Sequence, residues 1–197
     1  EVLPAYMSAP EAMAPDAIEI HPGTPNVYYE TNCIKGDDTA PIMESAPNVV
    51  EVEAYCSRQP HLPIEPDVAY AYTDEEGRIT IHSKSIGIHL HHAMICEGIG
   101  VAPEKLRIVQ LHAGGTFGYK FSPTIEALTG VATLVTGRPV ALNFNMHQMI
   151  TYTGKRSPGF MNIKLAADEN GKILALEGNN YIDPGPYSEF GALLTMR

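Results

Sequence analysis

The chain of 197 residues has only three cysteines, Cys33, Cys56 and Cys96, and none of them belongs to a CxxC pair. An odd number of widely spaced cysteines argues against a disulfide framework, a zinc ribbon or an iron–sulfur cluster within these residues. Each cysteine is explained most simply as a small apolar side chain. The pattern favours a reducing compartment, and we expect a cytoplasmic location.

Positive charge and long apolar runs are also scarce. Thirteen Lys and Arg face 23 Asp and Glu, which gives a net charge of −10, and the cations are scattered along the chain. Nucleic-acid binding requires clustered cations, so we expect no nucleic-acid partner. No window approaches the roughly 18 to 20 consecutive apolar residues of a membrane helix, so we expect no membrane partner.

Apolar residues are nevertheless plentiful, at 44% of the chain, which is enough for a packed core without disulfides or a structural metal. Runs of β-branched and aromatic residues predict strands at 26–31, 49–55, 68–72, 79–82, 105–111, 140–152, 161–167 and 172–181. Two pairs of these strands are hairpins, joined at 74–77 and 168–171, and the loop at 36–41 can open into a short helix. The first 25 residues are rich in proline and form a lead-in segment, so we divide the chain into 1–25 and 26–197.

Two longer helices are predicted among these strands. One is capped by Ser83 or Ser85 and runs to about residue 98. The clearer one spans 123–136, with Ser122 as N-cap and Gly137 as its stop. Its predicted apolar side consists of Ile125, Leu128, Ala132 and Val135. Neighbouring strand pairs with interspersed helices predict an α+β fold with mixed or antiparallel sheets rather than a doubly wound parallel sheet.

Three segments could carry chemistry. A glycine-rich turn, Ala113-Gly114-Gly115-Thr116-Phe117-Gly118-Tyr119-Lys120, lies between a strand and a helix, where main-chain amides can approach a ligand; plain turn geometry is the alternative. In the proline-rich loop 58–67, His61 and Glu65 either brace a site or form hydrogen bonds within the loop. In the segment 152–158, Lys155 and Arg156 either hold an anion or belong to a solvated turn.

A histidine cluster offers a competing interpretation. His89 and His92 would share one helical face, with His91 between them, which suggests a metal- or ligand-binding module without catalytic activity. Zinc sites need further ligands, and no HExxH motif accompanies these residues. The residue order also reveals no GxSxG motif and no nucleophile with a matching base.

Taken together, the order and spacing of three segments resemble the large molybdenum-binding subunit of the xanthine oxidase family. These segments are His-x-x-x-Glu-Pro at 61–66, Gly-Gly-Thr-Phe-Gly-Tyr-Lys at 114–120 and Thr-Gly-Lys-Arg-Ser-Pro at 153–158. The resemblance extends to Pro22–Asn26 and to Gly36-Asp37, and so spans nearly the whole chain. Within the family it is strongest to bacterial aldehyde oxidoreductases that carry molybdopterin cytosine dinucleotide.

The resemblance implies an enzyme that oxidises aldehydes to carboxylic acids with oxygen from water, while electrons leave through [2Fe–2S] clusters in other parts of the protein. It places Gly115, Thr116, Phe117, Gly118 and Tyr119 at the molybdopterin cofactor, with no direct ligand to the metal. The family's usual turn has glycines where Thr116 and Tyr119 stand.

The resemblance also places the substrate channel at Phe121, where purine-oxidising members have a glutamate. A phenyl ring there suits an aldehyde better than a purine. Phe190 and Leu193 are candidates for the same wall.

The family's general-base glutamate and its cluster cysteines have no matching positions in these residues. We therefore expect a fragment of a longer chain, inactive by itself, whose partners are an aldehyde, the remaining domains of the same enzyme, an electron acceptor protein and, as an option, a second copy in a homodimer. A carbon monoxide dehydrogenase or an N-heterocycle hydroxylase is the alternative within the family.

Overall fold

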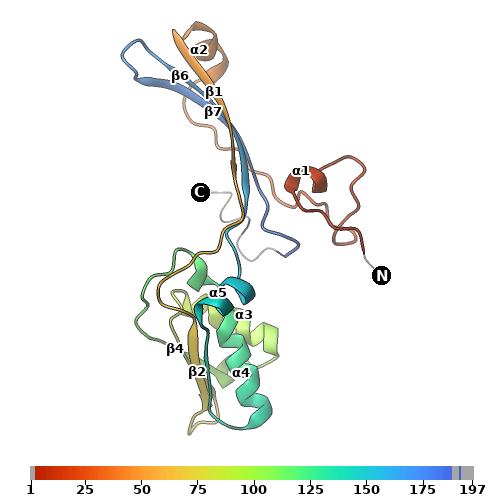
Figure 1. The fold of residues 1–197 in the computed structure, drawn as a ribbon, viewed down its shortest axis with the longest axis vertical. Coiled ribbons are helices and arrows are strands. Elements are labelled where there is room, and N and C mark those ends of the chain that lie inside the picture. Colours follow the sequence, from red (N-terminus) through yellow and green to blue (C-terminus); the bar gives the residue numbers. More distant parts are fainter. Residues whose placement is uncertain (1–2, 188–190, 192–197) are drawn as a thin grey trace. The chain divides into compact units, whose positions relative to one another are not determined.

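The computed structural model describes residues 3–187 and 191, and these residues form two compact units. The first unit combines the described residues up to Gln59 with those from Arg156 onward, and the second is Pro60–Lys155. Each unit has its own sheet and its own helices, as Figure 1 shows. The predicted α+β fold with mixed and antiparallel sheets is confirmed, whereas the predicted division at residue 25 stays a prediction.

The sheet of the first unit has three antiparallel strands in the order β1-β6-β7 (Figure 1). These are β1 (Asn48–Cys56), β6 (Gly159–Ala167) and β7 (Ile173–Ile182). The helix α2 (Thr39–Ser45) packs on β6 and β7, and its Met43 forms a small buried cluster with Ala166 and Ala175. The predicted strands in these regions and the short helix after Gly36 are therefore confirmed.

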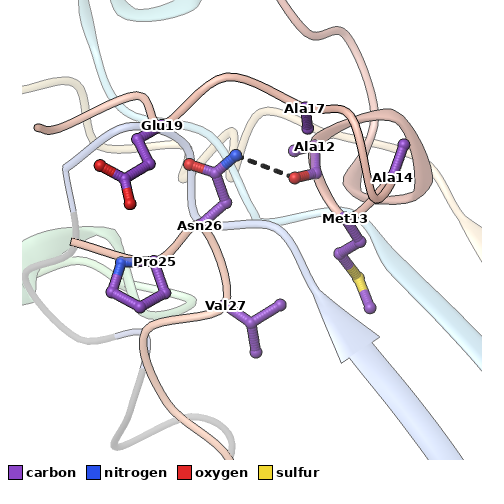
Figure 2. Close-up of a pocket in the computed structure, with 8 residues that line it drawn as sticks. All are labelled: Ala12, Met13, Ala14, Ala17, Glu19, Pro25, Asn26 and Val27. Atoms are coloured by element: carbon purple, nitrogen blue, oxygen red, sulfur yellow. Dashed lines mark hydrogen bonds between the residues drawn. The ribbon is translucent and has the colours of Figure 1, made fainter. Parts of the chain in front are cut away.

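The predicted strand at 26–31 is wrong, because these residues pair with no described strand. The side-chain amide of Asn26 instead donates to the carbonyl oxygens of Ala12 and Ile18, each at 2.9 Å, and its carbonyl oxygen accepts from the Ile20 amide. Figure 2 shows Asn26 directed at Ala12, the last residue of the short helix α1 (Ala9–Ala12). These bonds fold the lead-in segment on itself.

The sheet of the second unit has four strands in the order β4-β3-β2-β5. They are β2 (Val68–Thr73), β3 (Ile79–Ser83), β4 (Leu106–Gln110) and β5 (Val140–Asn143). Only β3 and β4 are parallel. They are joined through α3 (Ile88–Ile99) and the short 3₁₀ helix η1 (Pro103–Lys105), and α3 and α4 (Thr124–Thr136) lie beside the sheet (Figure 1). The core includes Ala71, Ile81, Ile95 and Ile125, all buried.

The helix α3 begins at Ile88, later than predicted, and neither predicted serine caps it. The Ser83 hydroxyl accepts from the Ser85 amide at 2.8 Å, and the Ser85 hydroxyl accepts from the Gly87 amide at 3.1 Å. The serines thus satisfy main-chain amides in the connection between strand and helix. The helix ends as predicted near Gly98, with Gly100 in the left-handed conformation as its C-cap.

The helix α4 ends at Gly137 as predicted, but its cap and its buried side differ from prediction. Pro123, not Ser122, occupies the N-cap position. Of the predicted apolar side only Ile125 is buried, while Leu128 and Val135 are exposed. The buried side consists instead of Ile125, Glu126, Thr129, Gly130 and Thr133. The reason is close approach to the sheet: a Cβ at Gly130 would lie 3.3 Å from the Ile81 side chain.

The predicted strand at 140–152 is correct only for its first part, β5, and the rest is a helix, α5 (Met146–Tyr152). Asn145 and Gln148 form a capping box, in which each side chain accepts the main-chain amide of the other at 2.9 Å. Nowhere in the described residues is there a helix long and apolar enough to span a membrane. The predicted cytoplasmic location stays a prediction.

Candidate functional site

The residues of the glycine-rich turn and their partners lie at one end of the strands of the second unit's sheet. The parallel strands β3 and β4 both finish at this end, and β2, antiparallel to β3, begins there. Lys84 comes directly after β3, the turn comes after β4, and Asp67 comes directly before β2. These three segments are far apart in sequence and meet at this end of the sheet. A hollow lined by Gln110, Leu111 and His112 lies at the entry to the turn.

The turn, residues 113–121, reverses direction through three left-handed residues. Gly115 has a φ of 96°, Phe117 of 50° and Gly118 of 94°. Positive φ is uncommon outside glycine, so Phe117 holds a conformation that its surroundings must stabilise. The Thr116 hydroxyl accepts from the Gly118 amide at 3.1 Å, and the Tyr119 amide donates to the Thr116 carbonyl at 3.0 Å. The result is a compact bend with Phe117 62% exposed at its tip.

Glu65 from the proline-rich loop holds the first and last parts of this bend. Its carboxylate accepts from the Gly114 amide at 2.8 Å and forms an ion pair with the buried ammonium of Lys120. Burial alone would raise the pKa of Glu65, but the hydrogen bonds from Lys120 and Gly114 outweigh it, and the pKa is lowered. Glu65 thus braces a neighbouring segment, and the alternative of bonds confined to its own loop does not describe it.

His61, predicted to act with Glu65, also lies against the bend. Its ring centroid is 5.8 Å from that of Tyr119, and its Nε2 would be 3.9 Å from a Cβ at Gly118. A larger residue at Gly118 would therefore meet both an unfavourable φ and a nearby imidazole. His61 and Glu65 therefore converge on the same bend.

A buried network of charged groups lies beneath the bend. The Tyr119 hydroxyl donates to Asp67, whose other carboxylate oxygen forms an ion pair with Lys84. Lys84 is also 3.7 Å from Glu126, which accepts from the Ser83 hydroxyl. Burial lowers the pKa of Lys84 to about 8 despite the opposing effect of Glu126. Burial raises the pKa of Tyr119 to about 12, so the phenol stays protonated and remains a donor.

Phe121, the predicted channel residue, closes the short 3₁₀ helix η2 (Tyr119–Phe121) and is 43% exposed. Its ring lies 3.6 Å from the position of a Cβ at Gly87, and its carbonyl oxygen lies 2.5 Å from the His91 ring nitrogen. The other two predicted channel residues, Phe190 and Leu193, lie outside the described residues. The side chain of Tyr119 is buried, so the contact that we predict between this residue and the cofactor involves its main chain.

The histidine cluster does not form a metal site in the described part of the chain, where no group of three or more His, Cys, Asp or Glu side chains could hold an ion. His91 is buried and bonds the Phe121 carbonyl, and His92 bonds the carbonyl oxygens of Pro103 and Leu106. His89 is exposed. His91 and His92 therefore bond different main-chain carbonyls, and His89 faces solvent.

The segment with two cations, 152–158, is held in part by local bonds. The Lys155 ammonium donates to the Thr153 carbonyl oxygen, and burial lowers its pKa. The Arg156 amide donates to the Gln59 carbonyl at 2.8 Å, as part of a short bridge between the two segments that enter and leave the first unit. The predicted role of Lys155 and Arg156 in holding an anion stays a prediction.

Sequence reasoning missed Asp67, Lys84 and Glu126. Two of them had a recognisable signal, since Lys84 lies two residues after the predicted apolar strand at 79–82 and Glu126 lies next to Ile125 in the predicted helix. A charge next to a core element is costly to bury alone, so such residues often have partners. The sequence does not show which residues those partners are.

Comparison with known proteins identifies the family. Residues 20–197 match the family described as the molybdopterin cofactor-binding domain. The chain belongs to this family. It is 60% identical, over all 197 residues, to the aldehyde oxidoreductase of Megalodesulfovibrio gigas, and it covers 22% of that protein. The resemblance to the molybdenum-binding region of the xanthine oxidase family is thereby confirmed.

Solved structures agree. The chain matches the aldehyde oxidoreductase from Desulfovibrio gigas with a TM-score of 0.89 and that from Desulfovibrio desulfuricans with a TM-score of 0.87. Both matches have 60% identity and cover 100% of this chain and 22% of the other. The chain therefore spans about a fifth of the length of these relatives.

The bend fits a cofactor that is contacted by main-chain groups. Gly114, Gly115 and Gly118 are exposed, and a Cβ at Gly115 would meet only the Phe117 ring, at 3.7 Å. The side chains of Tyr119 and Lys120 are buried, so the exposed surface of the bend consists mainly of its glycines with Ala113, Phe117 and Phe121. A flat ligand rich in oxygen and sulfur acceptors can approach such a surface closely.

Proposed function

We propose that this chain is the part of an aldehyde oxidoreductase that forms one wall of the molybdenum cofactor site and of the substrate channel. The observation that carries the proposal is the bend at 113–121, which is braced from within and exposes glycine main chain outward. It occurs in a chain that matches an aldehyde oxidoreductase at 60% identity over its whole length. When bound, the cofactor supplies the oxidation of an aldehyde to a carboxylic acid with oxygen from water.

In this proposal the residues of the chain bind, orient and exclude water. Gly115, Thr116, Gly118 and Tyr119 place main-chain atoms against the cofactor, and the Gly118 and Tyr119 amides, which bond Thr116, hold the shape of this surface. Phe117, exposed at the tip, covers the position next to the metal and keeps water away from one side of it. Molybdenum is held through the pterin and receives no ligand from these residues.

Phe121 is proposed to favour aldehydes over purines. Its exposed phenyl ring is an apolar surface, whereas a purine has several polar groups that would each lose about 1 to 3 kcal/mol if they were buried without partners. Phe190 and Leu193 are proposed to extend this apolar wall. An apolar lining therefore discriminates against polar heterocycles more than it attracts aldehydes.

The finer features of the enzyme are also part of the proposal. The cofactor is the cytosine dinucleotide form of molybdopterin, and the [2Fe–2S] clusters lie in parts of the protein outside these 197 residues. The other domains of the same enzyme, an aldehyde, an electron acceptor protein and, as an option, a second copy are the partners. The cysteines support placing the clusters outside this chain: the chain has three, Cys33 and Cys56 are exposed, and no two of them form a CxxC pair.

Elemental analysis of the purified full-length protein tests the proposal. Molybdenum near one atom per chain, with phosphorus and released cytidine nucleotide, is the expected result. Stoichiometric zinc or nickel without molybdenum would support the metal-binding module instead and would overturn the proposal. The 197-residue segment with added cofactor should show no aldehyde turnover, because the remaining catalytic groups lie elsewhere.

Replacing Phe121 by glutamate in the full-length protein tests the channel. Phe121→Glu should lower kcat/KM for aromatic aldehydes by roughly tenfold or more, because a carboxylate replaces apolar contact, and should improve binding of polar heterocycles. Phe121→Leu is the matched control and should retain the preference for aldehydes. An unchanged preference in Phe121→Glu would remove this residue from the channel.

A further inference from the structure

Two neighbouring residues at the end of the bend, Tyr119 and Lys120, turn their side chains inward and reach two carboxylates of one short segment. Lys120 pairs with Glu65, and the Tyr119 hydroxyl donates to Asp67. We propose that Asp67 and Tyr119, together with the Glu65–Lys120 pair, form a two-point clamp of positioning residues that sets the orientation of the bend toward the cofactor. This inference rests on the proposed function and assigns a role to residues buried behind the site.

Two attachment points restrict the bend in a way that one cannot. Held by Glu65 alone, through the Gly114 amide and the Lys120 ammonium, the bend could still rotate about the one carboxylate that both groups share. The bond from the Tyr119 hydroxyl to Asp67 removes this freedom. Tyr119 and Asp67 occupy other positions in the chain than Lys120 and Glu65, so the bend is held at a second, separate point. Pro66 separates the two carboxylates and fixes its own φ, so their spacing is less variable than that of two residues in a flexible loop.

The buried charges keep Asp67 able to accept. Asp67 is 1% exposed, and an isolated carboxylate at such a position would be strongly destabilised. Lys84 compensates it through an ion pair, and the same ammonium lies 5.7 Å from the centre of the Tyr119 ring. Lys84 thus stabilises both members of the second attachment point. It is itself 3.7 Å from Glu126, at the start of α4.

The clamp acts on the exposed residues through the main chain. The Tyr119 amide donates to the Thr116 carbonyl, and the Thr116 hydroxyl accepts from the Gly118 amide. Fixing Tyr119 therefore fixes the three residues before it, among them Phe117 with its unusual positive φ. A strained conformation persists only where surrounding contacts hold it, and the clamp supplies such contacts.

Tyr119→Phe in the full-length protein tests the clamp, since it removes one hydroxyl and keeps the ring. We expect amide hydrogen exchange at 114–121 to become about tenfold faster, the change typical of losing one buried hydrogen bond to a charged group. Exchange in β2 and in the last turns of α4 should stay unchanged. Molybdenum should be lost several-fold faster during gel filtration at a temperature where both proteins are fully folded.

Tyr70→Phe is the matched control, because it removes an exposed hydroxyl from β2 of the same unit, and both readouts should equal those of the wild type. Glu65→Gln is a second variant that keeps an acceptor for Gly114 but leaves the buried Lys120 ammonium without its counter-charge, so we expect an increase in exchange at the same residues at least as large as in Tyr119→Phe. If Tyr119→Phe lowers the unfolding temperature without a local increase in exchange at 114–121, the network is only a core ion cluster and the clamp is overturned.

The two readouts separate this inference from the proposed function. If the wild-type protein carries no molybdenum, the proposed function fails, and the exchange measurement still decides whether the clamp orders the bend. If the wild type carries molybdenum but Tyr119→Phe retains it as tightly as the wild type does, the proposed function stands and the positioning role is overturned.

Discussion

The two units of this chain use their apolar residues differently. In the second unit, sheet and helices enclose a core in which Ile81, Ile95 and Ile125 are at most 1% exposed. Among the described residues of the first unit, the hydrophobic core is the small buried cluster at α2, and every residue of β1 is exposed. The comparison shows that similar strand-forming sequence can build either a closed core or an open face.

The pairing register explains the open face. Val50 pairs with Leu165, which pairs with Leu176, and Val52 pairs with Ile163, so these side chains share one face of the sheet. The opposite face carries Glu51, Lys164 and Glu177 in the same way, and α2 packs on that polar side near Ala166 and Ala175. No described helix covers the apolar face.

The largest expected effect is in the closed core. Ile81→Ala should lower the free energy of unfolding of the second unit by about 2 to 5 kcal/mol, because it removes contacts with α4 and leaves a cavity beneath Gly130. Urea unfolding followed by exchange at the amides of β3 measures the loss. A loss below about 1 kcal/mol would mean that this core is less closely packed than described.

An intermediate effect is expected at the start of α5. Asn145→Ala removes the cap that accepts from the Gln148 amide, and should cost about 0.5 to 2 kcal/mol. Asn145→Asp, which keeps an acceptor and suits a helix N-terminus, is the matched control and should retain most of the stability. Thermal unfolding of both variants distinguishes the cap from a general polar effect.

A pH-dependent effect is expected in the hairpin between β2 and β3. The Arg78 amide donates to Asp74 and, with the Arg78 side chain and Thr80, lowers the pKa of this carboxyl from 3.8 to about 2. The stabilisation is complete above pH 4 and is lost as pH falls from about 4 to 2. Asp74→Asn should therefore show a smaller decrease in unfolding temperature over that range than the wild type.

Asp168, in the hairpin between β6 and β7 of the first unit, provides the control for Asp74. Its carboxylate accepts from the amides of Asn170 and Lys172, at 2.8 and 2.9 Å. The corresponding Asp168→Asn variant should leave the acid sensitivity of the second unit unchanged, as judged by amide exchange in β2 and β3 between pH 5 and pH 2. A parallel loss in both variants would show that the acid effect is not local to Asp74.

The smallest effect is expected on the open face. Val52→Ala in the 197-residue chain should change the free energy of unfolding by less than about 0.5 kcal/mol, because the side chain is 54% exposed and leaves no cavity. The same substitution measured in the full-length protein sharpens the comparison. A loss above about 1 kcal/mol there would show that other parts of the protein cover this face.

Much of the fold was predictable because local signals were strong. The hairpins at 74–77 and 168–171 have aspartate and glycine between apolar strands, and α4 stops at Gly137, which has a positive φ. The errors occurred where a tertiary partner decided the outcome. Residues 26–31 have strand-like side chains but pair with none of the described strands. The second part of the predicted strand at 140–152 is the helix α5, which begins at the Asn145–Gln148 capping box.

The candidate site was predictable only in part. The glycine-rich turn and Glu65 were recognisable from residue type and order, and the structure brings them together at 2.8 Å. Asp67, Lys84 and Glu126 were not recognised, because each is an ordinary charged residue until the sheet brings the three together. The predicted roles of Phe190 and Leu193 lie outside the described residues and stay predictions.

The sequence by itself determined the α+β class, the glycine positions that allow the bend and the apolar residue at 121, because these depend on properties of single residues and their near neighbours. The tertiary structure alone decided which side of α4 is buried, which carboxylates hold Tyr119 and Lys120, and which face of the first sheet is open. Those features depend on strand order and register, which join residues more than 50 positions apart, as Asp67 and Tyr119 are. Local sequence carries no direct record of such contacts.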